Sequence, residues 1–137
     1  MGYILRNILA VIVGILVGGT VNMALVVVSG HIIPPPEGTD VSSIESLQAS
    51  IPLFEPKHFL FPFLAHALGT LVGALVASLI AASRRLLVAM LVGVFFMMGG
   101  LANVLVLPSP AWFSALDLLG AYLPMAWLGW RLSGRKR

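Results

Sequence analysis

One histidine and one aspartate lie inside stretches of sequence that are otherwise apolar, and this pair could bind a ligand or exchange a proton. His66 occurs within residues 59–82, and Asp117 occurs within residues 111–130. An ionisable side chain inside a bilayer is costly unless it faces protein or water and finds a partner. A carboxylate next to an imidazole orients the ring and favours its charged form. We therefore expect His66 and Asp117 to lie in contact.

Uncharged polar residues occur at a similar depth in the neighbouring stretches. These are Asn22, Asn103 and Thr70, which follows His66 by one helical turn. At 1.5 Å per residue, each stretch then carries a strong polar residue roughly 6–11 Å below its outer end. The pattern predicts a polar pocket in the outer half of a membrane. In that pocket His66 and Asp117 would contact a small molecule, an ion or a lipid, which the protein binds or moves, and the other three residues would orient them.

The same residues allow a second interpretation, in which they only hold helices together. Hydrogen-bonded polar side chains between helices are a common packing device in membranes. The chain would then be a structural or accessory subunit of a membrane complex, and the polar residues would form a packing clasp. An open cavity lined by the polar side chains would favour binding, whereas a packed core in which they bond only to one another would favour the clasp.

Other chemistries find little support in the sequence. The absence of cysteine excludes disulfides and thiolate metal sites. The three histidines lack the tight helical spacing of an HExxH zinc motif. Asp117 is the only carboxylate inside an apolar stretch, which excludes a diiron carboxylate bundle. We therefore expect no metal, no cofactor and no catalytic residue. Enzymatic activity is left open, but the sequence favours a protein that is not an enzyme.

Four apolar stretches supply the elements that position these residues, over residues 8–28, 59–82, 86–107 and 111–130. Each holds about 20 residues, the length that a helix needs to cross the ~30 Å hydrocarbon core of a bilayer. Charged residues make up only 9% of the chain, against roughly 25% in soluble domains, so the surface must face lipid. The sequence predicts an all-α fold, a four-helix transmembrane bundle that forms a single integral membrane domain over residues 1–137.

The basic residues lie at the ends of the apolar stretches rather than on one face of a helix. Seven of the eight fall on one side of the membrane if there are four crossings: Arg6, Arg84, Arg85, Arg131, Arg135, Lys136 and Arg137. Lys57 falls on the other side. By the positive-inside rule both termini are cytoplasmic, and we expect a multi-pass protein of a bacterial inner membrane. The expected partner is membrane lipid, and this arrangement of charge argues against nucleic acid.

A loop over residues 30–58 is the longest segment outside the apolar stretches. The prolines from Pro34 to Pro36 favour extended geometry and prevent the first helix from continuing. Asp40 can cap a short helix over residues 41–49, and apolar residues at helical spacing give this helix one apolar side. We expect a short amphipathic helix that lies flat on the outer face of the bundle.

Small residues recur every four positions in two of the predicted helices. They are Gly14 and Gly18 in the first, and Ala65, Gly69, Gly73, Ala77 and Ala81 in the second. Small residues at this spacing form a smooth groove, where another helix can approach closely and gain dispersion contacts. The approaching helix belongs either to the same bundle or to another chain, which would make the protein a homo-oligomer or the partner of a second membrane subunit.

Overall fold

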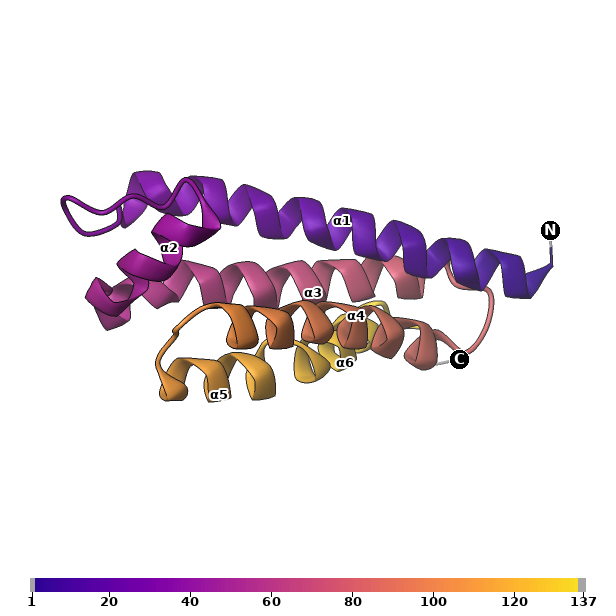
Figure 1. Ribbon diagram of the computed structural model, residues 1–137. Helices are drawn as coiled ribbons and strands as arrows, with labels where there is room; N and C mark the ends of the chain where they lie inside the picture. The colour runs from indigo at the N-terminus through magenta and orange to yellow at the C-terminus, as the bar shows by residue number, and fades with distance from the viewer. Residues whose placement is uncertain (1, 136–137) are drawn as a thin grey trace.

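The computed structural model describes residues 2–135, which form helices joined by loops and turns, with no strand among them (Figure 1). The predicted all-helical fold is therefore confirmed. The elements in chain order are α1 (Tyr3–Ile32), α2 (Ile44–Ser50), the 3-10 turns η1 (Ile51–Leu53) and η2 (Pro56–Phe59), α3 (Leu60–Ile80), α4 (Arg85–Val106), α5 (Ala111–Gly120) and α6 (Leu123–Leu132). Three helical segments of this described part are long and apolar enough to cross a membrane: Tyr3–Ile32, Pro56–Ile80 and Arg85–Val106.

The bundle is arranged around α3, which packs against α1, α4 and α6 (Figure 1). α3 runs antiparallel to α1, and α4 runs antiparallel to α3. A loop joins α1 to α3 at one end of the bundle, and a tight turn joins α3 to α4 at the other end. α1 has 30 residues, so it is about 45 Å long and extends beyond the predicted stretch at both ends.

The interior of the bundle is made of small residues, and the large apolar side chains lie on its surface. Fully buried positions include Ala10, Ala65, Ala74, Ala77, Ala81, Ala89, Ala121 and Ala126. Large exposed side chains include Leu16, Met98, Leu105 and Leu119, each more than half exposed. This distribution is the reverse of a soluble core, and it matches a helix bundle whose backbones approach closely while lipid covers the outside.

The glycines of α1 lie directly against those of α3. A methyl group added at Gly14 would lie 2.6 Å from the carbonyl oxygen of Gly73, and one added at Gly73 would lie 2.6 Å from the carbonyl oxygen of Gly14. One turn further on, a methyl group at Gly69 would lie 2.8 Å from the carbonyl oxygen of Gly18. The two rows of small residues in the sequence therefore face each other within one chain. Ala65 and Ala77 on α3, and Ala81 just after its end, are fully buried.

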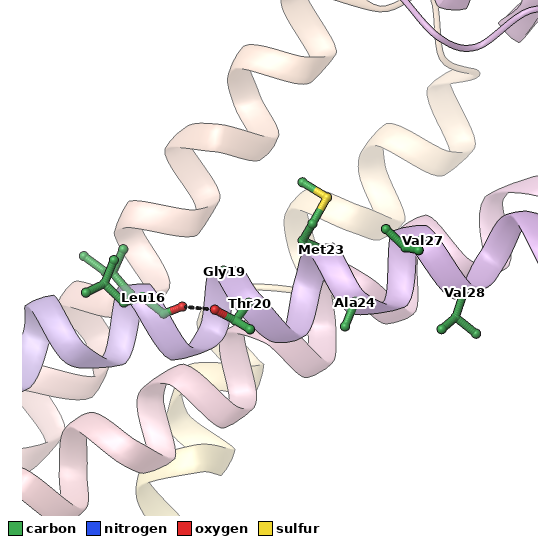
Figure 2. A pocket seen from close by; sticks show the side chains of 8 residues that line it. Leu16, Gly19, Thr20, Met23, Ala24, Val27 and Val28 are labelled. Carbon is green, nitrogen blue, oxygen red and sulfur yellow. Dashed lines mark hydrogen bonds between the residues drawn. The ribbon is translucent and has the colours of Figure 1, made fainter.

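α1 is covered on one side only. Its buried residues are Ala10, Gly14 and Gly18, and the opposite side carries a shallow open groove of about 740 Å³ between Ile15 and Val28 (Figure 2). The hydroxyl of Thr20 in this groove donates a hydrogen bond to the carbonyl oxygen of Leu16, at 2.8 Å. The polar atom is therefore satisfied within its own helix, as an apolar environment requires.

The fourth apolar stretch is not one continuous helix, which differs from the prediction over residues 111–130. It forms two ten-residue helices, α5 and α6, separated by Ala121 and Tyr122. Pro124 lies in the first turn of α6, where it has no N–H to donate and its ring would clash with the carbonyl of Gly120 in an unbroken helix. Each half is about 15 Å long, so neither alone crosses a bilayer.

Basic residues gather at one end of the bundle. Arg6 Nε donates to the carbonyl oxygen of Ile80 at 2.6 Å, and Arg135 Nη1 donates to the carbonyl oxygen of Leu79 at 3.2 Å. The start of α1, the turn between α3 and α4 and the segment after α6 therefore meet at this end. Lys136 and Arg137, which belong to the same predicted basic group, lie outside the described residues.

At the opposite end, the loop between α1 and α3 contains the expected short helix, but the predicted cap, Asp40, is wrong. α2 starts at Ile44 and is capped by Ser43, whose hydroxyl accepts from the N–H of Ser46 at 3.1 Å. Asp40 instead accepts from the N–H of Ser42 at 2.9 Å, and hydrogen bonds from the side chain and backbone of Ser42 hold the pKa of Asp40 below its usual value.

α2 is fixed across the ends of other helices rather than to α1 alone. Gln48 Nε2 donates to the carbonyl oxygen of Val106, the last residue of α4, at 2.8 Å. Leu47 and Ile51 pack into an apolar cluster with Phe59 and Phe113. The loop thereby covers the region where α4 ends and α5 begins.

Candidate functional site

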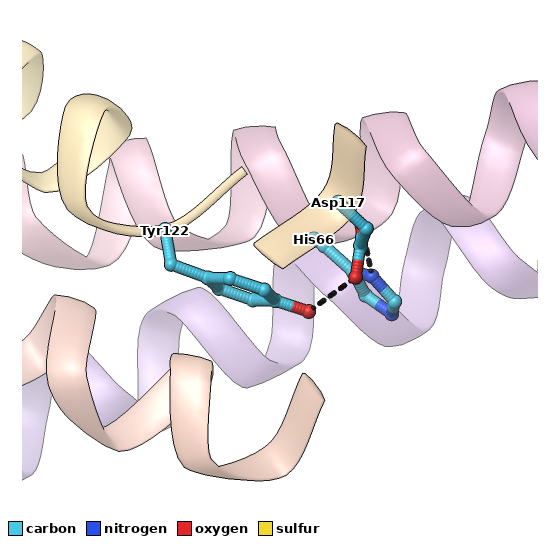
Figure 3. Close-up of polar contacts among 3 residues, drawn as sticks. All are labelled: His66, Asp117 and Tyr122. Carbon is cyan, nitrogen blue, oxygen red and sulfur yellow. Dashed lines mark hydrogen bonds and ion pairs between the residues drawn. The ribbon is translucent and has the colours of Figure 1, made fainter. Parts of the chain in front are cut away.

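Three polar side chains from α3, α5 and the break before α6 meet inside the bundle (Figure 3). His66 Nδ1 and Asp117 Oδ1 lie 2.8 Å apart, and the Tyr122 hydroxyl donates to Asp117 Oδ2, also at 2.8 Å. The rings of His66 and Tyr122 lie nearly parallel, with centroids 5.8 Å apart. The contact expected between His66 and Asp117 is therefore present, and Tyr122 joins it.

Asp117 is the centre of this polar cluster. It is 3% exposed, and each of its two oxygens has a hydrogen-bond partner. An ionised carboxylate only accepts hydrogen bonds, so beside it the Nδ1 of His66 carries the proton. When the ring is neutral, its other nitrogen, Nε2, is left as an acceptor for another group. The His66 side chain is 19% exposed, so it is the member of the cluster that a ligand can reach.

Tyr122 was not identified from the sequence, and the reason is geometric. In a continuous helix, residues 117 and 122 would point about 140° apart around the axis. The break between α5 and α6 gives Tyr122 a backbone conformation of φ −117° and ψ −80°, which brings its ring back over Asp117. The sequence does contain an indication of the break, because Gly120 and Pro124 lie on either side of it and both residues favour helix interruption.

Gly100 of α4 provides the space for the Tyr122 ring. A methyl group at Gly100 would lie 2.6 Å from Cζ of Tyr122 and closer still to its hydroxyl oxygen. Tyr122 is 2% exposed, so the ring is enclosed between α4 and the polar cluster. Its hydroxyl is directed at Asp117 by packing as well as by the hydrogen bond.

Two cavities adjoin His66 and share three lining residues, His66, Gly100 and Asn103. The first, which we call the outer cavity, has a volume of about 190 Å³ and reaches Asp117. Its remaining walls are mostly apolar and aromatic, including Phe54, Phe59 and Phe113. A pocket of apolar walls with a few convergent polar groups is the usual form of a small-molecule site.

The second cavity, which we call the α1–α4 cavity, has a volume of about 220 Å³. It is lined from α1 by Asn22, from α3 by His66 and Gly69, from α4 by Phe96, Gly99, Gly100 and Asn103, and by Tyr122. The Oδ1 atom of Asn22 is buried and has no hydrogen-bond partner. An acceptor that the described chain leaves unused therefore belongs to a residue that lines the cavity.

The structure brings four of the five predicted site residues to these cavities. His66 and Asn103 line both, Asp117 lines the outer cavity, and Asn22 lines the α1–α4 cavity. Thr70 is fully buried, has no partner for its hydroxyl and lines neither cavity. Within residues 2–135, no group of three or more histidine and acidic side chains is placed to hold a metal ion.

Comparison with known proteins found no match to any protein family, to any curated protein or to any solved structure. Function is therefore inferred from the geometry of the chain itself.

Proposed function

We propose that the chain crosses the membrane four times, with α5 and α6 together making the fourth crossing. They extend over residues 111–132, about the length that one crossing requires. Interrupted backbone at membrane depth is tolerated where protein hides it from lipid. Both residues of the break meet that condition, since Ala121 is fully buried and Tyr122 nearly so. The end that carries the basic residues and both termini is cytoplasmic, by the positive-inside rule.

We further propose that the outer half of this bundle binds a small molecule, an ion or a lipid through His66, and that the bound species is held there or moved. The observation that carries this proposal is the position of the imidazole. Asp117 fixes one ring nitrogen, and the ring itself borders both cavities. A ring fixed in this way presents Nε2 in a constant direction, which is the preorganisation that a binding site needs.

Unused polar atoms favour binding over a packing clasp. In a clasp, buried polar groups bond to one another, because an unsatisfied one costs roughly 1–3 kcal/mol. Here Asn22 Oδ1 is buried without a partner among the described residues, and the Asn22 residue lines the same cavity as His66 and Asn103. A ligand with a hydrogen-bond donor, or a water molecule, would supply the partner that Asn22 Oδ1 lacks.

The second candidate function is that of a structural or accessory subunit in a membrane complex. It is favoured by Asp117 itself, whose two oxygens are already satisfied inside the bundle and which is almost fully buried. The uncovered side of α1 would be the face that meets the partner. The α1–α3 glycine contact is internal, so it does not supply that face.

Native mass spectrometry of the protein released from membranes tests the binding proposal. We expect the wild-type chain to carry a bound small-molecule mass that His66→Gln loses. His31→Gln is the matched control, because His31 is exposed at the end of α1, away from both cavities, and it should keep the bound mass. A wild-type spectrum with the bare chain only, or an unchanged bound mass in His66→Gln, would contradict the proposal.

A further inference from the structure

The α1–α4 cavity opens on the side of the bundle rather than at its end. Gly99 and Asn103 of α4, which line the cavity, are exposed at the surface. No atom lies within 4 Å of the position that a Cβ at Gly99 would occupy. The neighbouring side chains on the same helix, Phe95, Met98 and Leu101, are large, apolar and about half exposed or more. In the proposed membrane orientation the mouth of the cavity therefore faces hydrocarbon.

Below this mouth, α1 and α4 are in direct contact and leave no opening between them. A methyl group at Gly14 would lie 3.2 Å from Val92, and one at Gly18 would lie 2.9 Å from the ring of Phe96. Phe96 is also a wall of the cavity. The two helices therefore touch along their cytoplasmic halves and leave the cavity open only in the outer half, at the level of Asn22.

The polar lining of the cavity consists of the His66 ring and the amides of Asn22 and Asn103. His66 Nε2 is an acceptor when the ring is neutral and Nδ1 carries its proton beside Asp117, and the two amides both donate and accept. Among the described residues no lysine or arginine lines either cavity, and the partners of the Asp117 carboxylate there are His66 and Tyr122. The group that fits this environment supplies N–H or O–H donors, and an ammonium group would also balance the charge.

The cavity is large enough for a head group and too small for a chain. Its volume of about 220 Å³ corresponds to about seven water molecules at their volume in the liquid. An apolar chain attached to such a head group would remain outside the mouth, against the exposed apolar side chains of α4.

We infer that the ligand of the proposed His66 site is a single-chain amphiphile with a hydrogen-bond-donating head group, and that it enters sideways from the bilayer between α1 and α4. The inference rests on the proposed binding function and adds to it the ligand class and the route. Asn22 and His66 receive the head group, and the acyl or alkyl chain stays in the outer leaflet.

Nitrogen NMR of the three histidines tests this inference, with the protein in phosphatidylcholine nanodiscs. The phosphatidylcholine head group has no N–H or O–H donor, so the host lipid does not compete. The probes are dodecylammonium, dodecanol and dodecanoate at pH 8, which share one chain length and differ in the head group. We expect the first two to shift the Nε2 signal of His66, assigned with His66→Gln, and dodecanoate to leave it unchanged.

The route is tested by a pair of matched variants. Gly99→Phe places a ring across the mouth of the cavity, and Gly19→Phe places the same ring on the uncovered side of α1. Neither position has an atom within 4 Å of an added Cβ, so both variants should fold. We expect Gly99→Phe to raise the apparent Kd for dodecylammonium by about tenfold or more, and Gly19→Phe to change it by less than about twofold.

The outcomes separate the inference from the function on which it rests. Equal binding by Gly99→Phe and the wild type would overturn the lateral route while the His66 site stands. Binding of dodecanoate as tight as that of dodecylammonium would overturn the donor head group. No shift of His66 with any probe, together with a bound mass in native mass spectrometry that depends on His66, would overturn the amphiphile but not the site. If no probe shifts the His66 signal and native mass spectrometry shows no bound mass, both the amphiphile inference and the His66 binding site would be overturned.

Discussion

Asp117 is the residue on which the polar cluster depends. It accepts one hydrogen bond from His66 on another helix and one from Tyr122 across the helix break. Removing the carboxylate would leave two donors in the interior without an acceptor, which costs more than the loss of a single hydrogen bond. Removing only the tyrosine hydroxyl would leave Asp117 with its other partner.

The cost of these two changes should therefore differ. We expect Tyr122→Phe to lower the free energy of unfolding by about 1 kcal/mol and Asp117→Ala to lower it by about 2–5 kcal/mol. Thr20→Val, which removes a hydroxyl bonded only to its own helix, should change it by less than about 0.5 kcal/mol. Unfolding in mixed micelles with sodium dodecyl sulfate, followed by tryptophan fluorescence, measures all three. Equal losses for Asp117→Ala and Tyr122→Phe would show that the cluster is not organised around the carboxylate.

The contact between His66 and Asp117 could be predicted from the sequence because apolar surroundings restrict the partners that ionisable side chains can find. Two ionisable side chains at matching depth in apolar stretches have few partners other than each other. Tyr122 could not be predicted in the same way, since its position relative to Asp117 depends on where the helix breaks. The unsatisfied oxygen of Asn22 and the shape of the cavities depend on packing between helices, which spacing along the chain does not reveal.

The contact between α1 and α3 is so close that it does not accommodate larger side chains at its glycines. Gly14 and Gly73 face each other backbone to backbone, so an added methyl group meets a carbonyl oxygen that cannot rotate away. The spacing of small residues indicated a close approach, and the structure places it inside the chain. The sequence pattern could not decide this, because a groove of small residues fits any second helix equally well.

Gly73→Ala should consequently destabilise the bundle by about 1–3 kcal/mol, as overpacking does in a tight interior. Gly19→Ala is the control, since its methyl group meets open space on the uncovered side of α1 and alanine favours the helix. We expect the control to unfold at the same detergent fraction as the wild type or a higher one. A loss in Gly19→Ala as large as that in Gly73→Ala would show that helix backbone contact is not the cause.

The break between α5 and α6 is the element that sequence periodicity missed. The stretch over residues 111–130 is mostly apolar, and its length alone predicted one helix. The interruption arises from Pro124 and is stabilised by the burial of Tyr122 against Gly100. Length and composition therefore located the segment, whereas its conformation depended on a single imino acid and on a neighbouring helix.

For the whole molecule, the two ends of the bundle differ in charge. Arg6 and Arg135 bind carbonyl oxygens near the end of α3, so the start and the end of the described chain lie on the same side. The loop at the other end carries the acidic residues Glu37, Asp40, Glu45 and Glu55, with Lys57 as its one basic residue. This arrangement requires an even number of crossings if the bundle spans a bilayer.

Reporter fusions give a direct measurement of that orientation. A fusion after residue 137 should give a cytoplasmic signal, and an insertion near Asp40 should give a signal on the opposite side, by the positive-inside rule. A fusion in the turn at Arg84 should agree with the one after residue 137. A cytoplasmic signal near Asp40, or opposite signals at Arg84 and at the end of the chain, would contradict four crossings.

The interrupted fourth segment also has a consequence for biogenesis. If this segment crosses the membrane, Asp117 in its first half and the shortness of each half make it a poor substrate for the translocon. α3 is synthesised first, and it carries the imidazole that Asp117 needs. The segment over α5 and α6 would then enter the bilayer only by packing against the helices already inserted. Its membrane insertion and its tertiary folding would occur together.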